Sequence, residues 1–471
     1  MTRRFFVFRV GCLAGVCLAA AGLASAQQGS SPEEGGPVLT FGLSSTLSAT
    51  DNYNLRPSEA ESVTLFDNRL SFGFRQRRRN DLLHFDFSGL LRANEPPGGS
   101  NRFDDRSARL GYDREGVNSA LSLGADYNLT SIGSLDPFDD DRFFDDDPLN
   151  ETDLTQDRGD REQISARFSF ETGLNDPLSF ALDGRYRERS FSGTTDPGLF
   201  DTRIFDLSAT TRFTFSPVTE ARVVLRFEDY SAKDAPRTDR QTSSLNLGLT
   251  QALSQVDTLD VSLGIQQIET EETVLGIRQS DTQTGMIGSL ALTRELTRGT
   301  IGTTFDLRES VNGTTATWMV ERAMPLPRGA LEVSLGATSD VSDTIRPVGR
   351  VGLTHEMARS TLTASLERQV RTSSRANELR TTRASLGYNY EINSLSQIDV
   401  SASFAELARA GGPAVNDTIR ADLRATYSHD LTRDWRLSSG YEHRIRDEDS
   451  RGRASSNRVF LTLERNFALR P

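Results

Sequence analysis

Residues 435–467, WRLSSGYEHRIRDEDSRGRASSNRVFLTLERNF, form the stretch that decides the fold, and residues 419–427, IRADLRATY, lead into it. Apolar and polar residues alternate along 419–427. The apolar positions are Ile419, Ala421, Leu423, Ala425 and Tyr427, and the polar positions are Arg420, Asp422, Arg424 and Thr426. Because successive side chains of a β-strand point to opposite faces, this segment predicts a strand with one apolar and one charged face. The alternation returns at 437–445 and 459–467.

The same period continues back to residue 38 and gives about 22 strand candidates, within a range of roughly 18 to 24. The chain of 471 residues is only 36% apolar and 25% charged. Low apolar content is also typical of disordered chains, but a persistent two-residue period excludes disorder over most of this chain. A barrel with a wet interior needs only every second residue to be apolar. We therefore predict an all-β fold, a single antiparallel transmembrane β-barrel of the outer-membrane type.

The predicted connections between strands alternate between short and long. Short connections include 172–177, 216–220 and 431–434, whereas longer, more polar ones include 193–199, 232–240 and 269–280. Bacterial outer-membrane barrels have short periplasmic turns and longer extracellular loops. An even number of strands then places both ends of the barrel on the periplasmic side.

The first 26 residues have the pattern of a secretory signal peptide. Three arginines precede an apolar run at 10–23, and Ala24-Ser25-Ala26 is a small-residue cleavage site. Both cysteines, Cys12 and Cys17, lie inside this segment, so the mature chain is predicted to lack disulfides and thiol chemistry. Residues 27–37 form a short polar leader, and residues 38–471 form the barrel. No later apolar run is long enough for a membrane-spanning helix, so we predict export to the bacterial outer membrane.

The charge balance excludes nucleic acid as a partner. Without the three arginines of the signal, 51 basic residues remain against 66 acidic ones. A nucleic-acid-binding protein needs an excess of positive charge. The basic residues are almost all arginine, and Lys233 is the one lysine. Arginine makes forked contacts with carboxylates, phosphates or sugars along a pore wall.

The tail from 426 to 467 resembles the end of the β-barrel porin 2 family, which includes outer-membrane barrels associated with exopolysaccharide production. The residues that carry the resemblance are Tyr427, Leu431, Thr432, Trp435, Tyr441, Asn457, Phe460 and Phe467. It implies a membrane location and a pore-like body, but no substrate. Phe460 and Phe467 also form the terminal aromatic signal that the barrel-assembly machinery reads. The chain continues to Pro471, where many barrels stop at the aromatic residue.

The most acidic connection, residues 131–160, is predicted to be a long extracellular loop. It contains two runs of three aspartates, Asp139, Asp140 and Asp141 and then Asp145, Asp146 and Asp147. Three interpretations stay open: an exposed outer loop, a carboxylate constriction that favours cations in the pore, or a Ca²⁺ site built from oxygen ligands. The spacing does not match an EF-hand.

Charged residues on the opposite face of the strands from the apolar ones are predicted to line the lumen. An arginine facing lipid at mid-depth would cost about 2–4 kcal/mol. The arginines singled out are Arg185, Arg187, Arg226, Arg424, Arg436 and Arg444. Such a wall suits the passage of polar or charged solutes, and the opposite charges can also brace it by pairing across strands.

No catalytic motif is present, and we predict that the protein is not an enzyme. The leading functional hypothesis is a porin-like channel for passive passage of small polar or charged solutes. One alternative is a barrel that assists exopolysaccharide export. Another is a structural or adhesive barrel whose acidic loops are bridged to lipopolysaccharide by divalent ions. Expected partners are outer-membrane lipid and lipopolysaccharide, the assembly machinery, and the solute or polysaccharide.

Overall fold

The computed structural model describes residues 36–58, 60–95, 100–132, 159–274, 276–339, 341, 344–372, 378–410, 417–449 and 452–470. These residues form an all-β structure of 22 strands. The strands are β1 Val38–Thr50, β2 Val63–Arg77, β3 Asp81–Glu95, β4 Ser100–Glu115, β5 Ser119–Ser131, β6 Asp160–Thr172, β7 Leu178–Ser192, β8 Thr202–Ser216, β9 Thr219–Ala232, β10 Asp239–Ala252, β11 Asp257–Val274, β12 Ile277–Glu295, β13 Thr300–Ser310, β14 Gly313–Leu326, β15 Gly329–Ser339, β16 Ile345–Glu356, β17 Ser360–Thr372, β18 Glu378–Asn393, β19 Ser396–Arg409, β20 Thr418–Asp430, β21 Trp435–Glu448 and β22 Gly452–Leu469.

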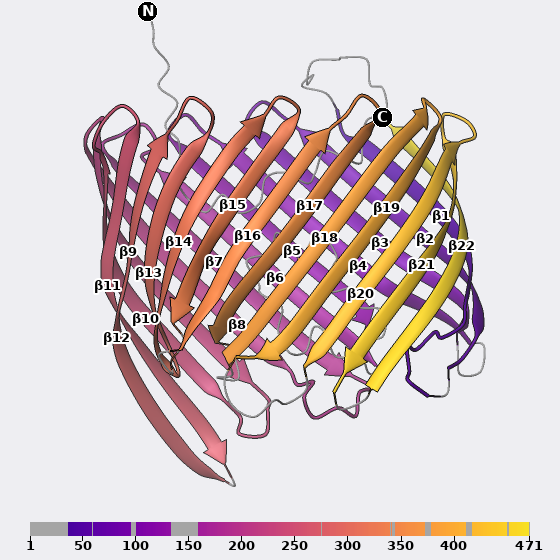
Figure 1. Ribbon diagram of the computed structural model, residues 1–471, viewed down its shortest axis with the longest axis horizontal. Helices are drawn as coiled ribbons and strands as arrows, with labels where there is room; N and C mark the ends of the chain where they lie inside the picture. Colours follow the sequence, from indigo (N-terminus) through magenta and orange to yellow (C-terminus); the bar gives the residue numbers. More distant parts are fainter. Residues whose placement is uncertain are drawn as a thin grey trace, which may run out of the picture.

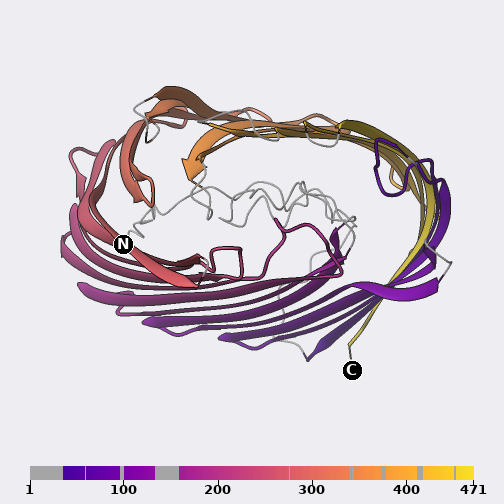
Figure 2. The same ribbon diagram turned by 90° about the horizontal axis from the view of Figure 1, so that it is seen from below.

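The sheet closes on itself. Each strand pairs antiparallel with the next along the chain, and β1 pairs with both β2 and β22. The closing register runs from Leu39 opposite Leu469 to Thr50 opposite Arg458, so the barrel begins and ends at the same rim. Figure 1 shows the tilted strands, and Figure 2 shows the wall as a closed, flattened ring. The predicted antiparallel transmembrane barrel of about 22 strands is confirmed.

The alternation seen in the sequence separates two faces of the wall. Large apolar residues such as Leu47, Phe66, Leu263 and Leu335 are exposed on the outer face. The residues that lie opposite them on neighbouring strands are also mostly apolar. Leu47 of β1, for example, lies opposite Phe66 of β2. Their sequence neighbours point into the lumen. An apolar outer face suits contact with lipid tails, and a polar inner face suits contact with water.

The longest described connections lie at one rim and short turns at the other, as predicted, although the rim with the long loops also carries the two-residue turn 311–312. We call the rim that carries the turns 217–218 and 327–328 the short-turn rim, and the rim that carries 193–201 and 233–238 the long-loop rim. Gly329 follows one short turn at φ 138°, and a Cβ there would lie 1.9 Å from the Thr354 carbonyl oxygen. A side chain at this position would therefore strain the turn.

One predicted loop is wrong. Residues 269–280 continue as strand, because β11 runs to Val274 and β12 starts at Ile277. The hairpin of β11 and β12 projects beyond the long-loop rim in Figure 1. Glu271 and Arg278 form an ion pair across it. Beyond the membrane both faces of a hairpin meet water, so these residues lose the apolar face by which a strand is recognised.

Aromatic rings cluster near the short-turn rim where the barrel closes. The Phe41 ring stacks on Phe467 at 5.3 Å between centroids and meets Phe72 edge-on at 5.2 Å. The Arg465 guanidinium lies over Trp435 at 5.2 Å and over Phe467 at 5.7 Å. Such rings favour the boundary between lipid and water, and arginine can extend its charged head into that boundary. The role of Phe467 as an assembly signal stays a prediction.

At the other end of the same seam, Asp51 joins β1 to β22. The backbone N–H and the side-chain amide of Asn457 donate to the Asp51 carboxylate at 2.7 and 2.6 Å. The Tyr441 hydroxyl donates to the Asn457 side-chain oxygen at 2.6 Å, and His443 Nδ1 lies 2.9 Å from it. The bonds from Asn457 hold the pKa of Asp51 below its ordinary value of 3.8.

Replacing Asp51 by alanine should weaken the seam in a pH-dependent way. Because folding depresses the pKa, the stabilisation is present above the unfolded-state pKa and is lost as the pH falls below it. At pH 7 we expect the free energy of unfolding to fall by about 0.5–1 kcal/mol. This is the lower part of the range for a hydrogen bond, because Asp51 is exposed. The difference between Asp51→Ala and the parent should shrink at pH 3. Urea unfolding of the barrel in detergent measures both values, and Asp281→Ala on the projecting hairpin is the matched control. An equal loss at both pH values would contradict the assignment.

An epitope inserted after Gly276, at the tip of the projecting hairpin, should bind antibody on intact cells. A Cβ at Gly276 would meet no atom within 4 Å, so the insertion should not disturb packing. The same epitope after Arg328, at the short-turn rim, should be labelled only after the outer membrane is permeabilised. The reverse labelling pattern would show that the barrel is oriented the other way.

Candidate functional site in the barrel lumen

A row of charged residues crosses the inner face of β20, β21 and β22. Arg424 is the central residue of β20 and lies opposite Glu442 of β21, which in turn lies opposite Arg458 of β22. Arg424 Nη2 donates to Glu442 Oε2 at 3.3 Å, and Arg458 Nη1 lies 3.6 Å from the same oxygen. The antiparallel register therefore places one carboxylate between two guanidiniums.

A third arginine and an aromatic ring complete this arrangement. Arg444, two residues along β21 from Glu442, has its Nε 3.6 Å from Glu442 Oε1. The guanidiniums of Arg424 and Arg458 lie 5.9 and 5.8 Å from the centroid of the Phe460 ring. We call Arg424, Glu442, Arg444, Arg458 and Phe460 the Glu442 cluster. It carries three positive charges and one negative charge.

Burial differs sharply within the Glu442 cluster. The side chain of Glu442 is 10% exposed, whereas that of Arg424 is 51% exposed. Arg444 and Arg458 lie between these values. Because a buried carboxylate must be paired, the arginines stabilise Glu442. Arg424 alone of the three presents about half of its side chain to the lumen.

The predicted lumen arginines of β7 and β9 do face inward, in a different charge environment. Arg185 lies opposite Arg167 on one side and Asp206 on the other. Arg226 donates to Asp206 through Nε at 2.8 Å and lies 3.7 Å from Glu228. Arg187 also lies on this inner face and is buried. The register places these residues on one part of the wall, far along the sheet from the Glu442 cluster.

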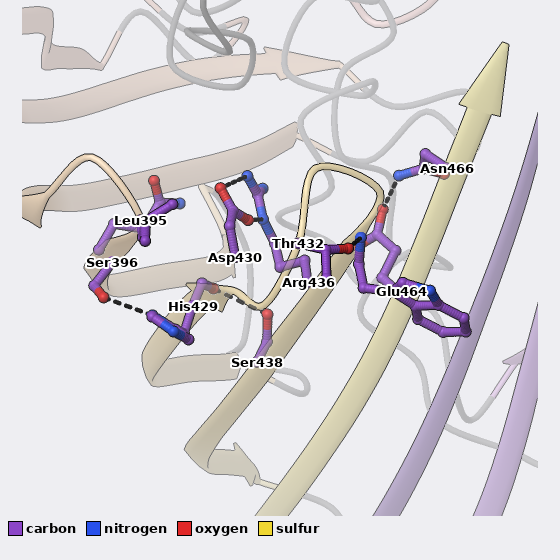
Figure 3. A network of polar contacts seen from close by, with 12 residues as sticks. Leu395, Ser396, His429, Asp430, Thr432, Arg436, Ser438, Glu464 and Asn466 are labelled. Carbon is purple, nitrogen blue, oxygen red and sulfur yellow. Dashed lines mark hydrogen bonds and ion pairs between the residues drawn. The ribbon is translucent and has the colours of Figure 1, made fainter.

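Arg436 lies at the short-turn rim and is part of a rim network. Its guanidinium donates to both carboxylate oxygens of Asp430, at 2.6 and 3.3 Å (Figure 3). Next to this pair, Ser396 Oγ lies 2.8 Å from His429 Nδ1, and Asn466 donates to Glu464. Each charge of the Arg436 pair is matched, so this arginine braces the turn 431–434 between β20 and β21.

The acidic residues Asp139–Asp147 lie outside the described residues, and so does any Ca²⁺ site they form. Within the described residues, no group of three or more His, Cys, Asp or Glu side chains is arranged to hold a metal ion. His443, the histidine nearest the long-loop rim, contacts Asn457 at the seam. In the described part of the chain, no helix is long and apolar enough to cross a membrane.

Sequence reasoning did not single out three of the five residues of the Glu442 cluster as lumen residues. The alternation put Glu442 and Arg458 on the polar face of their strands, but they were not singled out as lumen residues, and Phe460 was assigned to the assembly signal. The alternation gives their orientation. It could not show that a carboxylate on β21 sits level with arginines on both neighbours, because register depends on the pairing of strands.

Comparison with known proteins places the fold among outer-membrane barrels. No family model and no curated protein matches the chain. Among solved structures it is similar to the ferric-catecholate import receptor Fiu of E. coli K12, with a TM-score of 0.61, 10% identity, and coverage of 90% of this chain and 81% of that one. It is also similar to the FrpB iron transporter of Neisseria meningitidis, with a TM-score of 0.59, 8% identity, and coverage of 91% of this chain and 81% of that one. The siderophore receptor PiuA of Acinetobacter baumannii has a TM-score of 0.55 and 9% identity, with coverage of 91% of this chain and 82% of that one. At such low identity the likeness shows a shared fold.

Removing the central carboxylate should destabilise the barrel. Glu442→Ala leaves three guanidiniums close together without their shared partner, and we expect a loss of about 1–3 kcal/mol in the free energy of unfolding. Glu332→Ala is the matched control, because Glu332 also faces the lumen but is exposed on β15. Urea titration of the two refolded variants, followed by electrophoretic mobility of the unheated barrel, gives the comparison. Equal stability of the two variants would refute a bracing role for Glu442.

Proposed function

We propose that the protein is an outer-membrane channel through which small polar or charged solutes pass passively. The observation that carries the proposal is the inner face of the barrel, where charged side chains recur from β6 to β22. These charges are arranged along a wall that encloses the lumen. Side chains of this kind can exchange contacts with water and ions along a path across the membrane.

The similar structures support transport in a general way. Their titles describe an import receptor, an iron transporter and a siderophore receptor. The barrel fold therefore occurs in proteins that move solutes across the outer membrane. The similar structures do not indicate whether transport is passive. The proposal of passive passage rests on the charged inner wall of this chain. We propose the same membrane location here, with lipid and lipopolysaccharide around the barrel and the assembly machinery as the partner that inserts it.

The arrangement of inward-facing rings favours small solutes over a polysaccharide. A sugar chain is expected to slide along stacked aromatic side chains. On the described strands, the inward rings Phe191, Tyr230 and Phe460 belong to β7, β9 and β22, which are not neighbours. Phe191 packs against Ile132 and Leu199. Assistance to exopolysaccharide export stays a prediction from the family resemblance, and a structural or adhesive role stays the third possibility.

The proposal predicts steady current steps from the refolded chain 27–471 in a planar bilayer. The size of the steps should rise with salt concentration, and neutral sugars of small size should enter vesicles that contain the protein. The unheated, folded form must first be shown by its electrophoretic mobility, and the heat-unfolded chain is the control. A folded barrel that carries neither current nor sugar would rule out a passive channel.

A further inference from the structure

We infer that the Glu442 cluster is a binding site for an oxyanion, the carboxylate or phosphate group of a solute in the lumen. The inference deepens the proposed function, because it names the class of solute that the channel would favour. It also differs from the cation-favouring constriction, one of the three interpretations left open for the acidic segment 131–160.

Charge is the first reason. Some arginines elsewhere on the inner wall form a one-to-one pair with an acid. Arg222, for example, donates to both carboxylate oxygens of Asp260, at 2.7 and 2.6 Å. In the Glu442 cluster one carboxylate serves three guanidiniums, at 3.3 to 3.6 Å. An arginine forms its strongest contacts in bidentate pairs with oxyanions. The cluster therefore holds more donors than Glu442 can accept.

An unsatisfied donor is the second reason. The Nε of Arg444 is buried and has no hydrogen-bond partner among the described residues, since its 3.6 Å contact with Glu442 is too long. Buried polar groups are normally hydrogen-bonded, and an exception calls for an explanation. A second oxyanion beside Glu442 would supply an acceptor for this donor.

Access and shape are the third reason. Arg424 exposes half of its side chain to the lumen, at the middle of β20. A solute that crosses the barrel near this wall must pass it. The Phe460 ring lies over Gly440, where an added Cβ would lie 2.5 Å from the ring atom Cζ. The glycine thus lets the ring lie against the wall beside Arg424, and an apolar surface next to an arginine suits an organic anion.

Binding can be measured on the folded barrel in an uncharged detergent by calorimetric titration with sodium phosphate and, separately, with sodium acetate. Saturable binding of either anion to the parent protein is expected. Arg424→Gln should weaken it at least tenfold, and Arg424→Lys, which keeps the charge but loses the fork, should fall between the two. Glu442→Gln, where it folds, should bind severalfold more tightly because a competing carboxylate is removed. Arg308→Gln is the matched control, since it removes one inward arginine from β13.

The outcomes separate the site from the channel. Saturable binding that Arg424→Gln loses and Arg308→Gln keeps supports the site, even if bilayers with the same protein stay silent. The relative strength of phosphate and acetate shows which kind of anionic solute it takes. A parent protein that binds neither anion overturns the inference, and so does equal weakening in both arginine variants. Current steps without anion binding would leave the channel standing and remove the site.

Discussion

The structure depends on one constraint, that every backbone N–H and C=O inside the membrane must find a partner within the protein. A sheet meets this demand only when it has no open edge. The pairing of β1 with β22 provides the closure, over a register that runs from Leu39 to Thr50. The contacts around that seam follow from it. Phe41 and Phe467 meet at one rim, and Asp51 and Asn457 meet near the other.

Closure also fixes where charge can go. Because the wall separates lipid from lumen, alternate side chains of each strand face lipid and lumen. Arginines and acidic residues therefore lie on the lumen side. Within the lumen the pairing of strands decides which charges are level with each other. On β9 and β11 it matches Arg222 with Asp260. On β20 to β22 it sets a single Glu442 among three arginines. The same rule of alternation thus produces a balanced wall in one region and a positively charged one in another.

The uneven distribution of charge on the inner wall relates the fold to the proposed channel function. A channel needs a wet and polar wall, whereas selectivity needs a place where that wall is locally unlike the rest. The Glu442 cluster is such a place because it combines excess positive charge, a half-exposed Arg424 and the ring of Phe460. By contrast, Arg436 and Asp430 at the short-turn rim are matched and serve the turn.

The sequence by itself determined the barrel, an approximate number of strands and the face of each alternating residue, because a period of two is a local property of the chain. It failed at 269–280, where the strands leave the membrane and no longer need an apolar face. It also identified Arg424 and Arg444 as lumen residues but not their grouping with Glu442, Arg458 and Phe460. Only the tertiary structure decided that grouping, because the level at which neighbouring strands meet depends on turns and pairing, which alternation within one strand does not encode.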